Sequence, residues 1–154
     1  MDGEFVCEDV FGTTKGVAGG NIILMGPEPD GVLAAAEEAV VAMRRIEGIA
    51  LPFPGGVARS GSKVGSKYKA LRASTNTAFA PTLRGMVPTE LPEDASCAYE
   101  IVIDGLTLDA VEQATADGLR AAARAGRGVV AATSGNYGGK LGPYHIRLHD
   151  VLKR

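Results

Sequence analysis

The chain has 154 residues, 45% of them hydrophobic, and a formal net charge of −2. This composition supplies a hydrophobic core for one domain over residues 1–154 and excludes intrinsic disorder. The slight acidity and the 5% aromatic content argue against a nucleic-acid partner. Because no signal peptide begins the chain and no apolar run reaches the about 18 residues of a membrane span, we expect a soluble, cytoplasmic protein without a membrane partner.

The first half of the chain predicts strands around one helix. Residues 3–11 have mixed alternation and begin as a strand, and residues 21–26 form an apolar run typical of a buried central strand. Residues 32–46 have helical period, with Asp30 as the expected N-cap. Residues 49–51 predict a short edge strand, because prolines follow them directly. The expected apolar stripe of the helix is Val32, Leu33, Ala36, Val40, Met43 and Ile46.

The second half repeats this order after an irregular, proline-rich insertion at residues 76–92. Residues 98–105 alternate as a second central strand, and residues 107–125 predict a second helix. In that helix Thr107 is the expected cap, Gly126 the expected stop, and Val111, Ala114, Leu119 and Ala122 the buried face. Residues 129–133 predict a third apolar strand, and the alternation of residues 144–151 predicts a final one.

Two strand–helix–strand halves predict an α+β sandwich of the split βαβ type. In this fold both helices cover one face of an antiparallel sheet, and the insertion becomes a long loop.

The cysteines and histidines do not predict a metal site. Cys7 and Cys97 lie 90 positions apart without a CxxC partner, so we expect two buried free thiols. His145 and His149 are four positions apart on an expected strand, which separates them by about 13 Å. Two exposed imidazoles are the simpler interpretation.

Residues 53–76 are rich in glycine, serine and lysine or arginine and contain no carboxylate. Glycine admits a ligand close to the backbone, hydroxyls donate hydrogen bonds, and cations attract anions. The spacing fails for a phosphate-binding P-loop, because Ser66 separates Gly65 from Lys67. A solvated loop and an oligomer contact are the alternatives to a binding site.

Glu100 is the single residue most suggestive of catalysis. It opens a strand whose interior is apolar, so its carboxyl group lies either on the open face or partly buried. Partial burial is the environment in which a carboxyl group serves as an acid or a base. The residue alone leaves a structural role open.

Five blocks of sequence, in order, resemble the formylmethanofuran–tetrahydromethanopterin formyltransferase family. The family has about twice this length and two similar ferredoxin-like lobes, and the chain resembles its second, distal (C-terminal) lobe. The blocks cover most of the chain: GEFVCEDVFG (3–12), GVAGGN (16–21), FPGGVARSGSKVGSKYKALRASTN (53–76), PEDASCAYEIVIDGL (92–106) and SGNYGGKLGPYHIRLHD (134–150).

The resemblance implies formyl transfer from formylmethanofuran to N5 of tetrahydromethanopterin, with no metal and no tightly bound cofactor. Glu100, in YEIVI, matches a glutamate of the family's active site, and a protonated Glu100 would stabilise the tetrahedral oxyanion. The acidic tails of both substrates suit the cationic loop. The implied substrate-binding residues are Ser60, Ser62, Lys63, Ser66, Lys67, Ser74, Thr75 and Asn76.

The resemblance also implies partners, namely a missing proximal lobe and further copies in a homo-oligomer. An isolated lobe is expected to be inactive alone. Two alternatives stay open: a non-catalytic assembly or ligand-binding module whose chemistry resides on the missing lobe, and a small-ligand sensor on the same fold.

Overall fold

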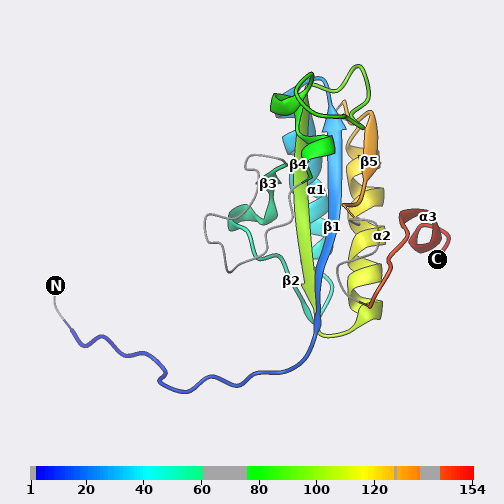
Figure 1. Ribbon diagram of the computed structural model, residues 1–154. Coiled ribbons are helices and arrows are strands. Elements are labelled where there is room, and N and C mark those ends of the chain that lie inside the picture. Colours follow the sequence, from blue (N-terminus) through cyan, green and yellow to red (C-terminus); the bar gives the residue numbers. More distant parts are fainter. Residues whose placement is uncertain (1–2, 61–75, 127, 136–142) are drawn as a thin grey trace.

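The computed structural model describes residues 3–60, 76–126, 128–135 and 143–154 (Figure 1). Eight helices and strands form the body: β1 (Val17–Gly26), α1 (Pro29–Met43), β2 (Ile49–Ala50), β3 (Ala58–Arg59), β4 (Cys97–Gly105), α2 (Leu108–Ala125), β5 (Ala131–Thr133) and α3 (Leu148–Val151). Three short 3₁₀ turns accompany them: η1 (Pro54–Gly56), η2 (Thr77–Phe79) and η3 (Pro81–Leu83).

The sheet is antiparallel throughout, in the order β2-β4-β1-β5, with β3 also paired to β4. The two long strands β1 and β4 are central, which agrees with their apolar sequences. Each helix connects strands that are not direct neighbours along this order, so the topology is the expected split βαβ arrangement. The α+β prediction is confirmed.

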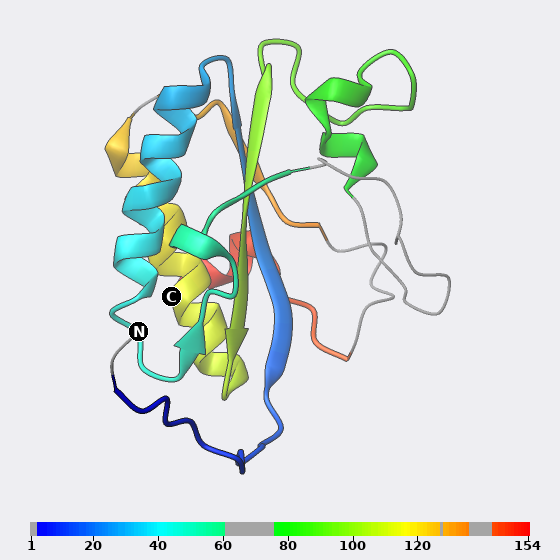
Figure 2. The same ribbon diagram turned by 90° about the vertical axis from the view of Figure 1, so that its left-hand side faces the viewer.

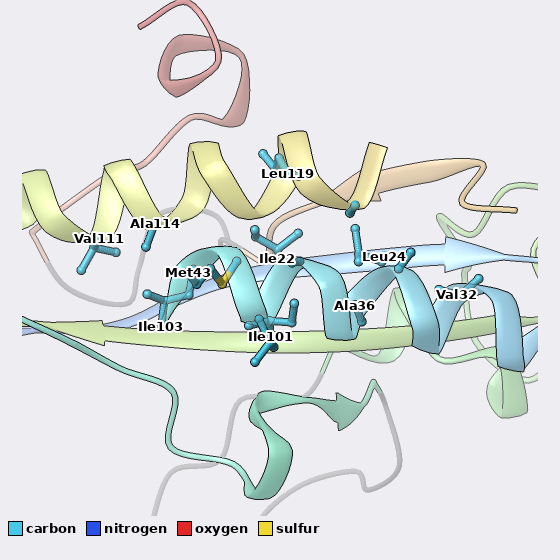
Figure 3. Close-up of a cluster of buried hydrophobic side chains, with 14 of the residues drawn as sticks. Ile22, Leu24, Val32, Ala36, Met43, Ile101, Ile103, Val111, Ala114 and Leu119 are labelled. Carbon is cyan, nitrogen blue, oxygen red and sulfur yellow. The ribbon is translucent and has the colours of Figure 1, made fainter. Parts of the chain in front are cut away.

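Helices α1 and α2 cover one face of the sheet (Figure 2), and the main core lies between the two layers. Alternate residues of the central strands, such as Ile22 and Ile101, point toward the helices (Figure 3). Burial of these side chains supplies the main stabilisation, at about 25 cal/mol per Å² of apolar surface. The residues labelled in this cluster are Ile22, Leu24, Val32, Ala36, Met43, Ile101, Ile103, Val111, Ala114 and Leu119.

The other face of the sheet is covered in part by the proline-rich insertion. A second, smaller cluster contains Ile23 and Met25 of β1 together with Leu91 and Ala95 of the insertion. The Arg84 guanidinium fastens this segment, because it donates hydrogen bonds to three backbone carbonyls between positions 92 and 95. Over the remainder of this face the described residues place no helix (Figure 2).

Both predicted terminal strands are wrong. Residues 3–16 have no regular secondary structure and are exposed, and Figure 1 shows them extending away from the sheet. Residues 143–147 are irregular, and His149 lies in the short helix α3, which packs near α2. In both places alternation is present, but no strand of the described sheet pairs with the segment, and alternation alone does not form a strand.

The helix boundaries agree partly with the predictions. Helix α2 begins after Thr107, whose hydroxyl accepts from a first-turn backbone N–H, and ends at Gly126 in the left-handed conformation, as expected. Helix α1 begins three residues earlier than predicted: Glu28 is its N-cap, and Asp30 lies inside the first turn. Proline at the first helical position favours this earlier start.

The two cysteines occupy different environments. Cys97 is buried, as expected, whereas Cys7 is exposed, because it lies on the extended N-terminal segment. Burial raises the pKa of the Cys97 thiol above the ordinary value. None of the described helices has the length and hydrophobicity required to span a membrane.

Candidate functional site

Glu100 lies near the middle of β4, half-buried, on the sheet face that the helices leave open. Its position follows from strand alternation, because Ile101 and Ile103 point into the helix-covered core and their neighbours point the other way. Ile23 of β1 pairs with it on one side and Ala58 of β3 on the other. The carboxylate is therefore presented from the centre of the sheet.

Two carboxamides hold the Glu100 side chain. The Asn21 Nδ2 donates to Oε1 at 2.5 Å, and the Asn76 Nδ2 lies 3.3 Å from both Oε1 and Oε2. Asn21 comes from β1, and Asn76 comes from the start of the insertion, so the two donors reach the carboxylate from different elements. Donation to a carboxylate is stronger than donation between neutral groups and fixes the orientation of the side chain.

The backbone of Gly135 sets the orientation of the Asn21 amide. Its N–H, which can only donate, lies 2.9 Å from the Asn21 Oδ1, so the Nδ2 of Asn21 must face Glu100. Among the described residues, the Glu100 Oε1 therefore accepts two amide donors, whereas Oε2 accepts one long contact, from Asn76.

Gly135 is also required sterically. A Cβ at this position would lie 2.9 Å from the Asn76 Nδ2 and 3.0 Å from the Asn21 Nδ2, and closer still to the Asn76 Oδ1. Real Cβ atoms almost never approach so closely. We call Asn21, Asn76, Glu100 and Gly135 the carboxamide cluster.

Ser60 lies two residues after Ala58, the partner of Glu100, and is opposite Ala98 of β4. Its backbone N–H donates to the Ala98 carbonyl at 3.0 Å, which extends the pairing of β3 with β4. The side chain is only 3% exposed, and its Oγ has no hydrogen-bond partner among the described residues. A buried hydroxyl without a partner is uncommon and marks a place where a ligand or another segment can supply one.

A cleft of about 640 Å³ adjoins the cluster. It is lined by residues 15–21 before and within β1, by residues 134–135 and 143–148, and by Thr115 of α2. Asn21 and Gly135 belong both to this lining and to the carboxamide cluster. Its volume is within the range of small-molecule sites in proteins.

The predicted substrate-binding residues are placed only in part. Ser60 and Asn76 are described, and Asn76 contacts Glu100 directly. The others fall outside the described residues: Ser62, Lys63, Ser66, Lys67, Ser74 and Thr75. Sequence reasoning missed Asn21 and Gly135, although Asn21 is the polar residue that opens an otherwise apolar run and Gly135 belongs to a glycine-rich block.

No cluster of three or more His, Cys, Asp or Glu side chains suited to a metal ion occurs in the described ranges. The polar groups that the described residues bring to Glu100 are the side-chain amides of Asn21 and Asn76. A split βαβ lobe with a fixed carboxylate beside a cleft of this size is the kind of place where proteins bind small molecules.

The comparison with known families agrees with this class. The profile of the family described as "FTR, proximal lobe" matches residues 3–151. The chain belongs to the formylmethanofuran–tetrahydromethanopterin formyltransferase family. The matched lobe is the proximal one, so the predictions of a distal lobe and of a missing proximal lobe are wrong. The motifs identify the family without identifying the lobe.

Curated relatives match nearly the whole chain. It is 51% identical over 154 residues to the formyltransferase of Rhodopirellula baltica, with 99% of this chain and 46% of the relative covered. The enzyme of Archaeoglobus fulgidus is 50% identical over 154 residues, with 99% and 52% covered. The chain thus spans about half the length of the curated relatives it matches.

Solved structures of the family have the same fold. The formyltransferase from Methanosarcina barkeri superposes with a TM-score of 0.78 at 43% identity, covering 88% of this chain and 46% of that one. The formyltransferase/hydrolase complex from Methylorubrum extorquens, solved with methylofuran, gives a TM-score of 0.77 at 47% identity, covering 88% and 44%.

Proposed function

We propose that the chain is one lobe of an enzyme that transfers a formyl group from formylmethanofuran to N5 of tetrahydromethanopterin. The observation that carries the proposal is the carboxamide cluster, in which Asn21 and Asn76 hold the Glu100 carboxyl group on the sheet face opposite α1 and α2. The family relationship supports the identity of the substrates, because relatives about 50% identical carry this name.

In the proposed reaction, N5 attacks the formyl carbon and a tetrahedral intermediate forms. The bond from that carbon to the methanofuran nitrogen then breaks, and the proton lost by N5 is balanced by the proton gained by the leaving amine. The acid form of Glu100 would donate to the developing oxyanion or pass its proton to the amine. Asn21 and Asn76 act as positioning residues, since both bond to Glu100.

The six predicted loop residues outside the described ranges, together with Ser60, remain our candidates for binding the acidic tails of the substrates. The buried Ser60 Oγ supports this assignment, because it has no hydrogen-bond partner among the described residues. No metal or tightly bound cofactor takes part in the proposed chemistry.

The test is a chimera in which this chain replaces the matching half of the Rhodopirellula baltica relative. Glu100→Gln keeps the shape of the side chain and removes the acid, so we expect kcat to fall about 10²- to 10⁴-fold. Glu93→Gln is the matched control, because Glu93 is exposed and lies outside the cluster. If the Glu100→Gln chimera transfers formyl groups at the full rate, the catalytic role of Glu100 is refuted.

An assembly role is the second candidate, and the extended N-terminal segment favours it. Phe5 is 89% exposed and Phe11 76%, and exposed apolar residues in such numbers mark contacts with another polypeptide. If this segment joins copies into the expected homo-oligomer, Phe5→Ser/Phe11→Ser will lower the mass measured by light scattering. Val41→Ser, at a half-exposed position on α1, is the control and should leave the mass unchanged.

A further inference from the structure

The start of β1 contains one residue more than the matching part of β4. Val17 pairs with Gly105. Gly20, three positions further along β1, pairs with Ile103, which is only two positions away along β4. Gly19, inside this interval, has a φ of 82°, in the left-handed region that glycine adopts without strain. The arrangement is a β-bulge, a feature that bends a strand and changes the direction of the side chains on it.

The bulge decides which face of the sheet Asn21 occupies. Val17 and Ile22 both belong to the helix-covered core, although five positions separate them. In a regular strand, side chains an odd number of positions apart point to opposite faces. Without the extra residue, burial of Val17 would therefore turn Asn21 toward the helices and Ile22 toward the open face. With the extra residue, Asn21 reaches Glu100 while Val17 stays in the core.

The Asp104 carboxylate holds the bulge from the neighbouring strand. Its Oδ1 accepts a hydrogen bond from the Gly19 backbone N–H at 2.8 Å. A bulge leaves backbone groups outside the regular pairing of the strands, and a charged acceptor is a strong partner for one of them. Asp104 lies four positions after Glu100 on β4, so both carboxylates project from the open face, about 13 Å apart.

The sequence at the bulge does little to define the pairing by itself. Residues 16–20 read GVAGG, and of residues 17–21 only Val17 is buried. Strands rich in glycine have weakly specified register, and a slip by one residue sends every side chain to the other face. A specific contact at this point therefore keeps the two strands in register.

We propose that Asp104 is a positioning residue for Glu100. By accepting from the Gly19 N–H it fixes the bulge at the place that directs Asn21 to the Glu100 carboxyl group. Its effect on catalysis rests on the proposed function, because that function makes Glu100 the reacting group. Asp104 itself needs no contact with a substrate for this role.

The first test follows the side-chain amide signals of Asn21 by NMR in the labelled chain. Asp104→Ala removes the acceptor. Gly19→Ala strains the bulge from the other strand, because its φ of 82° disfavours alanine while the new Cβ meets nothing within 4 Å. Gly85→Ala is the matched control, since Gly85 has a φ of 85°, equally open surroundings and no place in the bulge. We expect the Asn21 signals to shift in both bulge variants, to stay in place in Gly85→Ala, and to shift little in Asp104→Asn, which keeps an acceptor oxygen.

Kinetics in the chimera supply a second readout. Asp104→Ala should lower kcat about tenfold or more and leave KM within about twofold, because the misplaced Glu100 affects the reacting atoms more than the binding of substrates. Asp104→Asn should recover most of the rate. The double variant Asp104→Ala/Gly19→Ala should be about as slow as the worse single variant, since both changes disrupt one bulge. Gly19 lines the cleft, so KM is compared only for the Asp104 variants.

The NMR result decides whether Asp104 controls the direction of Asn21. Asn21 signals that stay in place in both Asp104→Ala and Gly19→Ala overturn the proposal, and so does an equal shift in Gly85→Ala. If Asp104→Ala fails to fold, Gly19→Ala decides alone, because it leaves every polar side chain unchanged.

The chimera separates this inference from the proposed function. If Glu100→Gln loses activity while Asp104→Ala keeps the wild-type kcat, the positioning role is refuted and formyl transfer stands. If Glu100→Gln keeps full activity and the Asn21 signals still shift in the bulge variants, Asp104 positions the cluster as proposed, and the catalytic role of Glu100 is refuted instead.

Discussion

Gly135→Ala is the sharpest probe of the carboxamide cluster, because it adds one methyl group and removes no polar atom. The new Cβ would lie 2.9 Å from the Asn76 Nδ2 and 3.0 Å from the Asn21 Nδ2, against the roughly 3.5 Å at which such atoms rest. The Asn21 amide must therefore move by about 0.5 Å, and the Asn76 amide by more, because its Oδ1 lies still closer to the new Cβ. The Asn76 contacts with Glu100 are already 3.3 Å long, so this shift breaks them.

A hydrogen bond to a charged group contributes about 1.5–3 kcal/mol to stability, and the half-exposure of Glu100 lowers this figure. We therefore expect the free energy of unfolding to fall by about 1–2 kcal/mol. For a chain of this size the corresponding drop in Tm is about 2–8 °C. Because the chain contains no tryptophan, the transition is best followed by circular dichroism.

Gly12→Ala is the matched control. An added Cβ there meets nothing within 4 Å, and its φ is outside the left-handed region, so stability should not change. Side-chain amide NMR signals of Asn21 and Asn76 should shift in Gly135→Ala and stay in place in Gly12→Ala. If both variants melt at the wild-type temperature with unchanged amide signals, the packing argument for the cluster is refuted.

Three further predictions concern the core, a helix cap and the thiols. Gly118→Ala should destabilise by about 1–2 kcal/mol in urea titrations, because overpacking against the fully buried Met43 exceeds the gain of about 1 kcal/mol in helix propensity; a more stable variant would contradict this. Thr107→Ala should cost about 1 kcal/mol by the same assay through loss of the N-cap hydrogen bond, and Thr107→Ser should retain most of it. At pH 8 iodoacetamide should modify Cys7 well before Cys97, since burial shields the latter and its raised pKa leaves less thiolate. Equal rates by mass spectrometry would contradict that assignment.

The parts of the fold that the sequence predicts are those in which one local pattern decides the outcome. Alternation along β4 places Glu100 opposite the apolar Ile101, and this local rule is enough to put the carboxylate on the open face. Helix α2 was predicted within one residue at its start, because Thr107 and Gly126 supply both the beginning and the end. Helix α1 lacks a side-chain cap, and its start was misplaced.

The composition of the carboxamide cluster could not be predicted in the same way. Asn21 is 79 positions from Glu100, and Asn76 is 24 positions from it. Their approach depends on the register between β1 and β4 and on the path of the insertion, and no local pattern specifies either. The two terminal strands were predicted wrongly for a related reason. A strand needs a partner strand, and no strand of the described sheet pairs with either segment.

The two faces of β4 have different environments: one packs against the helices, and the other carries Glu100. Side chains on one face pack against α1 and α2, so substitutions such as Ile101→Ala act first on stability. On the other face the described insertion residues pack on Ile23 and Met25, and Asn21 and Glu100 lie beside them. Glu100 is thus held by a central strand, and its partner Asn21 lines the cleft. The proposed catalytic role requires such a position, because a loop would place the carboxylate less accurately and the helix-covered face would exclude a substrate.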